Sequence, residues 1–127
     1  MLNRFAGGEL GATLTETVVA LAILSIVAGT FLSGLATTST ATIIANEQAT
    51  AESLARSQME YVKNCTYQYL ATEYPVDPSL NIPVGWSVPS PVVELVHATD
   101  DGLQKVTVTA EHNGEVVISV EVYKVDR

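Results

Sequence analysis

The side chains that could do chemistry are few, and their spacing matches no catalytic or metal site. His97 and His112 are the only two histidines, and neither has a second histidine at metal-ligand spacing. The pair Asp100-Asp101 precedes Gly102, which is typical of a turn. A calcium site built on these two aspartates is the open alternative, although the spacing is not that of a helix-loop-helix calcium loop. We therefore expect surface or edge histidines, a turn, no metal and no cofactor.

The sequence also lacks the motifs of nucleophilic catalysis. The single cysteine, Cys65, cannot form an internal disulfide, so we expect either a buried, inert thiol or an intermolecular bridge. No serine stands in the G-x-S-x-G context of hydrolases, and the chain contains no glycine-rich phosphate loop. The sequence thus predicts that this protein is not an enzyme.

The composition excludes further classes of protein. The chain has 127 residues, 14 Asp+Glu against 6 Lys+Arg, and 47% hydrophobic residues. This length suits one domain with a modest core. A disordered acidic chain would be less apolar, and a nucleic-acid-binding protein would need a basic face. Acidic and apolar residues are instead kept apart, because residues 17–46 contain no charged side chain.

Within this uncharged stretch, residues 18–36 form an apolar run. A helix of about 20 apolar residues crosses the hydrocarbon core of a bilayer, so the run is long enough. Its few hydroxyl side chains can bond to carbonyls of the same helix. Gly29 and Gly34 are typical of membrane helices, where small residues let a second helix approach closely.

One charged residue, Glu16, stands at the start of the run. A carboxylate at the edge of a bilayer costs free energy and is often functional, whereas a simple boundary residue would lie among the headgroups. A removed signal peptide predicts a basic stretch before the run, but Arg4 is the only basic residue there. An uncleaved single-pass anchor is the other general alternative.

The residues before Glu16 carry a more specific pattern. Gly11 is followed by Ala12 and a Thr-Leu pair, and Glu16 stands four residues after Ala12. This pattern resembles the class III signal of type IV prepilins and type II secretion pseudopilins. In that family a short leader ends in Gly, and Glu is the fifth residue of the mature chain. The segment Val19–Leu24 looks most like the minor pseudopilin I group and related minor pilins.

The resemblance implies a processing site and an assembly residue. Prepilin peptidase would cut between Gly11 and Ala12 and N-methylate Ala12. Glu16 would then pair with the positive amine, in its own helix or in a neighbouring subunit, because a charge buried in a filament needs a partner. The chain departs from the family pattern at Ala12, where Phe or Met is usual, at Thr15, where an apolar residue is usual, and at Glu9 in the leader.

The predicted fold class is α+β, with a long N-terminal helix packed on a small antiparallel three-stranded sheet, as in pilins. We expect a leader over 1–11, a transmembrane and assembly helix over 12–36, an amphipathic continuation over 37–70, and a head over 71–127. No proline interrupts the chain before position 75, so that one helix from about Leu14 to Leu70 is permitted.

The helix has a weak point in this prediction. Residues 37–42, TTSTAT, are poor helix formers and indicate either a flexible joint or a short linker. Beyond them the apolar residues recur at helical spacing, which predicts a face that packs on the sheet. The residues predicted for this face are Ile44, Ala51, Ala55, Met59 and Val62.

The head is predicted to be an irregular loop followed by a meander. All five prolines lie between residues 71 and 91, which indicates an irregular connection, with Trp86 as a core anchor. Antiparallel strands are expected over 92–98, 103–112 and 115–125, and the last two are joined by an Asn-Gly hairpin turn. The inward positions expected on the third strand are Val116, Ile118, Val120 and Val122.

The resemblance implies a structural minor subunit of a type IV pilus or a type II secretion pseudopilus. Before assembly it would span the cytoplasmic (inner) membrane once, with its head outside the cytoplasm. The implied partners are other pilin or pseudopilin subunits, prepilin peptidase, a platform protein, an assembly ATPase and membrane lipid. No nucleic-acid binding is expected. The alternatives are an uncleaved membrane-anchored binding module and a domain released by cleavage after about Ala36.

Overall fold

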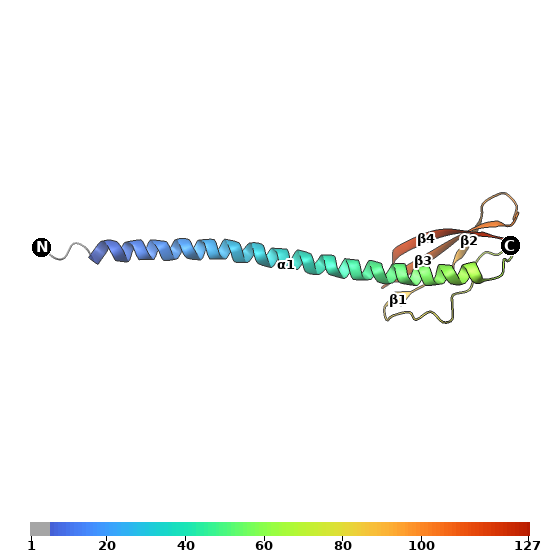
Figure 1. Ribbon diagram of the computed structural model, residues 1–127, viewed down its shortest axis with the longest axis horizontal. Coiled ribbons are helices and arrows are strands. Elements are labelled where there is room, and N and C mark those ends of the chain that lie inside the picture. Colours follow the sequence, from blue (N-terminus) through green and yellow to red (C-terminus); the bar gives the residue numbers. More distant parts are fainter. Residues whose placement is uncertain (1–5) are drawn as a thin grey trace. The chain divides into compact units, whose positions relative to one another are not determined.

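The computed structural model describes residues 6–127, and their side chains from Thr13 onward. A single long helix is followed by strands of one antiparallel sheet, which confirms the predicted α+β class (Figure 1). The elements are α1 (Ala6–Asn64), β1 (Trp86–Ser87), β2 (Val92–Leu95), β3 (Leu103–His112) and β4 (Glu115–Val125). The chain forms two compact units, Met1–Ile43 and Ile44–Arg127, which are described separately below.

The threonine-rich stretch 37–42 is helical, so a non-helical linker at this place is wrong. Its threonine hydroxyls donate hydrogen bonds to the carbonyls four residues earlier in the helix. These bonds, 2.9 to 3.1 Å long, are made by Thr37, Thr38, Thr40 and Thr42. Because each of these threonine hydroxyls has a hydrogen-bond acceptor within α1, it does not compete for other backbone groups. These residues of low helix propensity can therefore remain helical.

β3 is the central strand of the sheet. It pairs along its whole length with β4, from Leu103↔Val125 to His112↔Glu115. Its other edge pairs with β2 and, further along, with the short strand β1. The sheet therefore has four strands rather than the three expected, because β1 has only two residues and leaves no alternating pattern to detect.

One strand boundary and one inward position differ from the prediction. β2 ends at Leu95 rather than at residue 98, because its partner β3 begins just beyond the Leu95↔Gln104 pair. In β4, a bulge inserts one residue opposite the step from Ala110 to Glu111. Val116 is consequently 60% exposed, and its predicted inward position is wrong. The other three residues that were predicted to point inward, Ile118, Val120 and Val122, are half-buried.

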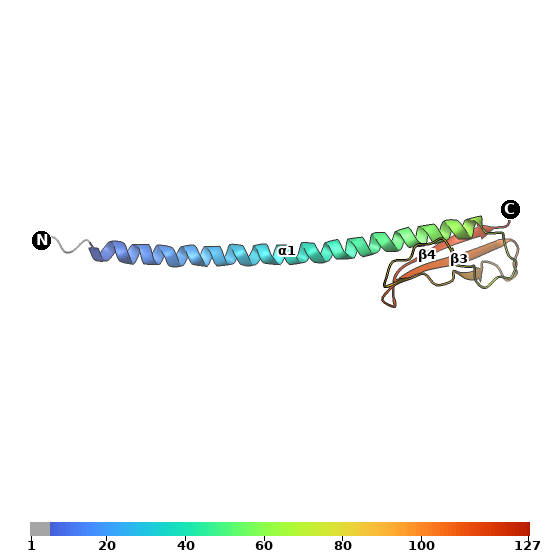
Figure 2. The ribbon, with the colours of Figure 1, turned by 90° about the horizontal axis from the view of Figure 1, so that it is seen from below.

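The second half of α1, from Ile44 onward, packs on the sheet (Figure 2). The predicted face is confirmed at Ala51, Ala55 and Val62, which are buried, while Met59 is half-buried. Ile44 is 56% exposed, so its predicted packing is wrong. The residues that complete the buried face at helical spacing are Leu54 and Gln58. Ile44 precedes Glu47, the residue of α1 that pairs with His112 at the end of β3.

Buried amide side chains hold the irregular connection between α1 and the sheet. Gln58 of α1 donates to the carbonyl of Pro75 at 3.0 Å and accepts from the N–H of Asp77 at 2.9 Å. Gln104 of β3 donates to the carbonyl of Gln68 at 2.8 Å and accepts from the Tyr74 hydroxyl at 3.1 Å. The connection makes few backbone hydrogen bonds with the sheet. Side chains of α1 and of β3 therefore hold it in place.

Trp86, in this connection, packs as predicted against a core cluster. The cluster contains Ala51, Leu54, Val88 and Ala110. The indole also stacks on the His112 ring at a centroid distance of 4.7 Å. The irregular connection over 71–91 is thus confirmed, apart from the short strand β1 and one isolated bridge from Glu73.

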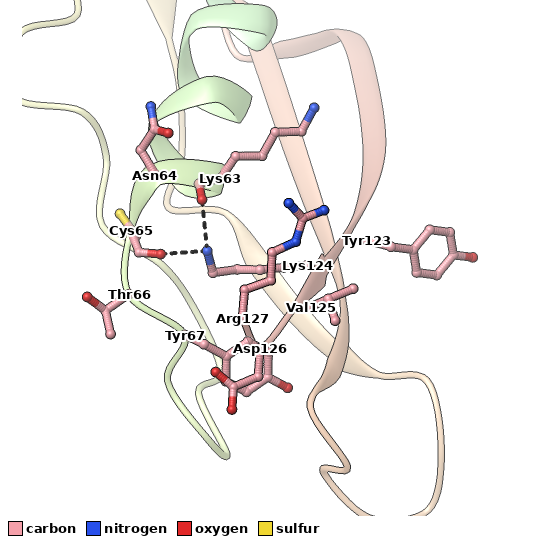
Figure 3. A pocket seen from close by; sticks show the side chains of 10 residues that line it. All are labelled: Lys63, Asn64, Cys65, Thr66, Tyr67, Tyr123, Lys124, Val125, Asp126 and Arg127. Carbon is pink, nitrogen blue, oxygen red and sulfur yellow. Dashed lines mark hydrogen bonds between the residues drawn. The ribbon is translucent and has the colours of Figure 1, made fainter.

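α1 ends at Asn64, six residues earlier than expected, and a buried lysine covers its end (Figure 3). The Nζ atom of Lys124 donates to the carbonyls of Val62, Lys63 and Cys65 at 2.8, 3.3 and 2.6 Å. A cation at this end also complements the helix dipole. Burial lowers the pKa of Lys124, so the ammonium is held by its carbonyl partners against a desolvation penalty.

Replacement of Lys124 by Met tests this helix end. Because three carbonyls lose their donor, we expect the free energy of unfolding to fall by about 1–3 kcal/mol. Urea titration of the full chain in detergent, followed by the fluorescence of Trp86, measures the change. Lys105→Met is the matched control, since Lys105 lies on the outer face of the sheet between Glu94 and Glu121. Equal losses in the two variants would contradict the capping role.

Candidate functional site

The most unusual surface of the described structure is the apolar segment of α1. Its large apolar side chains from Leu14 to Leu35 are 52% to 69% exposed. α1 is the one element of the described chain that is long and apolar enough to cross a membrane. Exposed apolar surface on this scale is not stable in water and marks a site for lipid or for other helices.

The hydroxyl groups of Ser25 and Thr30, within the segment, bond to carbonyls of the helix itself. The hydroxyl of Ser25 donates to the carbonyl of Leu21 at 2.7 Å, and that of Thr30 donates to Val27 at 2.9 Å. Every backbone group of a membrane-spanning segment needs an internal partner, and these side chains add no unsatisfied donor. The segment therefore combines a continuous apolar surface with internally satisfied hydroxyls, as a membrane-embedded helix requires.

Glu16 lies at the beginning of this surface and is exposed. It is the one ionisable side chain of α1 between Thr13 and Asn46. The Thr17 hydroxyl, one residue further on, is occupied by the carbonyl of Thr13 at 2.8 Å. A carboxylate in this place is solvated while the helix end is in water. It requires a positive partner once the end is buried among other helices.

The predicted cleavage and methylation site, Gly11 and Ala12, lies outside the residues whose side chains are described. The pairing of Glu16 with an amine at Ala12 therefore remains a prediction. The structure places Glu16 in the first turn of the exposed apolar surface, between Leu14 and Val18.

The histidines and aspartates of the head form pairs rather than a cluster. The Nδ1 atom of His97 lies 2.7 Å from a carboxylate oxygen of Asp101 in an exposed turn, and His112 pairs with Glu47 at the surface of α1. From Thr13 to Arg127, no group of three or more His, Cys, Asp or Glu side chains is arranged to hold a metal ion.

Asp100 is the most highly coordinated carboxylate of the described head. It accepts hydrogen bonds from the Tyr67 hydroxyl and from the N–H of Leu70 at 2.7 Å. It also accepts from Gln104 Nε2 at 2.8 Å and from the N–H of Gly102 at 3.3 Å. Desolvation raises the pKa of Asp100, but the four donors together outweigh it and hold the pKa at about 2. The carboxylate therefore ties the loop after α1 to the turn before β3.

A cleft with a volume of about 600 Å³ lies at the end of α1 (Figure 3). It is lined by residues 63–67 and 123–127. The buried cation in it, Lys124, already serves the end of α1, and Cys65 contributes its carbonyl to this cap. Cys65 is half-buried, so complete burial, as expected from the sequence, is not observed.

Several structural residues were not singled out from the sequence. Strand alternation from Val120 and Val122 does place Lys124 inward, so this signal was available. The burial of Gln58 and Gln104 has no signal in a single sequence, because a glutamine at an inward position looks like an ordinary interruption of the apolar pattern. Their roles depend on which loop carbonyls and N–H groups come within reach in the folded head.

No family model, curated protein or solved structure matches the chain. The exposed apolar segment of α1 and the position of Glu16 therefore carry the functional proposal.

Acid unfolding tests the role assigned to Asp100. Because its pKa in the folded state is about 2, below the ordinary 3.8, the ionised carboxylate stabilises the head above pH 4. This stabilisation is lost as the pH falls from 3.8 to about 2. Asp100→Asn should be less stable at neutral pH and should lose less stability between pH 4 and pH 2.

The measurement is the urea midpoint as a function of pH, with Trp86 fluorescence as the probe. Asp101→Asn is the matched control, because Asp101 is an exposed neighbour in the same turn and pairs only with His97 among the described contacts. If both variants kept the slope of the parent chain below pH 4, the assigned role of Asp100 would be wrong.

Proposed function

We propose that the chain is a structural minor subunit of a type IV pilus or of a type II secretion pseudopilus. Prepilin peptidase removes residues 1–11, and the mature chain is held in the cytoplasmic membrane by the first half of α1. The head lies outside the cytoplasm. Assembly then transfers the apolar segment from lipid into the core of a filament, where it packs against the same segment of other subunits.

The observation that carries the proposal is the uncovered apolar surface of α1 with one carboxylate at its edge. A plain anchor needs only the apolar residues, so a carboxylate at this position brings a cost without a use. In a filament the same carboxylate has a use, because it neutralises the amine created at Ala12. The spacing Gly11, Ala12, Glu16 supports this interpretation, and the α+β head is compatible with it.

The energetic argument concerns the transfer between lipid and filament. Apolar side chains find a similar environment in both, so association depends on close packing and on pairing of polar groups. Gly29 and Gly34 have no neighbouring atoms where a side chain would stand, so they leave room for a second helix. A paired Glu16 removes the main penalty for burying the end of the helix.

The first test is the mass of the mature chain. When it is produced with a prepilin peptidase, we expect an intact mass that begins at N-methylated Ala12. Gly11→Leu, which alters the leader side of the cut, should keep the full-length mass. A chain that retains Met1 in the presence of active peptidase would support the uncleaved anchored module instead. A chain that begins after about Ala36 would support a released domain.

The second test concerns Glu16. In Glu16→Leu the amine at Ala12 would be buried without a partner, and removal of one partner of a buried pair costs about 3–5 kcal/mol. Incorporation into filaments should therefore fall by more than about 100-fold, since each 1.4 kcal/mol corresponds to a factor of ten. Membrane insertion should be unchanged.

Sheared filaments and washed membranes, compared by immunoblot, measure the two quantities separately. Glu52→Leu is the matched control, because Glu52 is an exposed glutamate of the same helix. Normal incorporation of the Glu16→Leu chain would refute the assembly role. Loss of both insertion and incorporation would assign Glu16 to membrane targeting.

A further inference from the structure

His112 lies where three segments of the head meet. It is the last residue of β3, and it pairs in register with Trp86 of β1 and with Glu115 of β4. Its Nδ1 atom contacts a carboxylate oxygen of Glu47 on α1. One imidazole therefore joins the helix to the sheet at the end of the hairpin that β3 and β4 form.

The imidazole is held between this carboxylate and an aromatic ring. The centroids of the imidazole and of the Trp86 indole are 4.7 Å apart, and the two rings are within 17° of parallel. Trp86 in turn packs against the core cluster that contains Ala51 and Leu54 of α1. Because the core fixes the indole, the contact of His112 with Glu47 decides how firmly the hairpin end is attached to the helix.

The loop before β1 approaches the other ring nitrogen of His112. The N–H of Asn113 donates to the carbonyl of Gly85 at 2.8 Å. A Cβ at Gly85 would lie 3.4 Å from the Nε2 atom of His112, and the φ of Gly85 is +84°, a conformation that favours glycine. The imidazole therefore occupies a narrow place, and a change in its contact with Glu47 acts on the hairpin and on this loop together.

The charged groups around His112 are acidic. Glu47 comes from α1 and Glu115 from β4, while Glu111 precedes His112 in β3 and accepts a hydrogen bond from the Ser87 hydroxyl. Residues 83–86 of the adjoining loop carry no charge. Among the residues with described side chains, no lysine or arginine pairs with these three carboxylates. A positive charge on the imidazole therefore has carboxylates as its charged neighbours.

The contact differs between the two charge states of the imidazole. A neutral ring can donate one N–H to Glu47, whereas a protonated ring turns the same contact into a charge-assisted ion pair. A cation over the face of an indole is also attracted by the quadrupole of that ring. Both neighbours thus interact more strongly with the protonated imidazole, and histidine is the side chain that gains its charge near physiological pH.

We infer that the pair of His112 and Glu47 is a pH-sensitive latch between the β3–β4 hairpin and α1. At acidic pH the protonated imidazole pairs with Glu47 and fastens the hairpin end to the helix. As the pH rises and the imidazole loses its charge, the ion pair is lost and the hairpin end loosens. The inference goes beyond the proposed function and does not depend on it. A head outside the cytoplasm is exposed to the pH of the surroundings, which gives such a latch a use.

A double-mutant cycle at two pH values tests the latch. Urea titration of the full chain in detergent, followed by Trp86 fluorescence, gives the unfolding equilibrium constants. The chains compared are the parent, Glu47→Gln, His112→Gln and the double variant. At about pH 5.5 we expect the two side chains to be coupled by about fivefold, and at about pH 8.5 by less than about twofold. His97→Gln is the matched control, since His97 pairs with Asp101 in an exposed turn, and it should keep the pH dependence of the parent.

Amide hydrogen exchange of the parent chain gives a second measurement, which decides the question even where a variant does not fold. The N–H of Asn113 reports on the hairpin end, because it donates to Gly85. We expect its protection factor to fall by about threefold or more between about pH 5.5 and pH 8.5. The N–H of Val93 is the internal control, since it donates to the carbonyl of Thr72 at the other side of the sheet, and its protection factor should stay constant.

The results that would overturn the latch are distinct. Equal coupling at the two pH values would show an ordinary hydrogen bond, and coupling that is stronger at the higher pH would reverse the assigned sign. Absence of coupling at both pH values would show that the contact does not stabilise the head. Loss of the pH dependence in His97→Gln would assign it to the other histidine. Equal protection of the Asn113 N–H at both pH values would show that the hairpin end does not loosen.

Discussion

The first half of α1 has an apolar surface that no described residue of its own unit, Met1–Ile43, covers, and the other features of the protein are arranged around this constraint. A helix in water buries its apolar stripe on its own protein, but here the large side chains from Leu14 to Leu35 are all at least half exposed. Lipid or other helices must therefore supply the cover. Such a segment is long and apolar enough to cross a membrane. In the proposed function, Glu16 matters because a charge at that boundary has different partners in lipid and in a filament.

The head has a small apolar core, which consists mainly of Ala and Val with one Leu and one Tyr. Apolar burial alone therefore leaves much of the head unconstrained. Buried polar side chains supply the remaining constraints. Lys124 holds the end of α1, Gln58 and Gln104 hold the irregular loop, and Asp100 holds the turn before β3. Hydrogen bonds that are directional and fully satisfied can fix a long loop where a few apolar contacts could not. The same network holds Leu70 at a φ of +61°, a left-handed conformation that leucine disfavours.

The agreement between sequence and structure depends on the range of the interactions. The helix, β3 and the Asn-Gly hairpin were predictable, since periodicity and turn chemistry are local. The errors lie where a distant partner decides. α1 ends at Asn64, where Lys124 donates to the carbonyls of Val62 and Lys63, and Asp100 holds the chain beyond the helix at the N–H of Leu70. The bulge in β4 exposes Val116, and the short strand β1 forms only because β3 leaves an edge unpaired near His112.

An uncharged apolar helix, a carboxylate at its edge and a small α+β head can all be predicted from the amino-acid sequence. These features follow from composition and from spacing along the chain, which folding does not alter. Which polar groups are buried together, and which apolar groups stay outside, depends on the folded head. That Lys124 lies inside the head while Leu70 lies outside it reverses their usual preferences. The reason is that burial depends on the partners within reach, and those partners are brought together only by the fold.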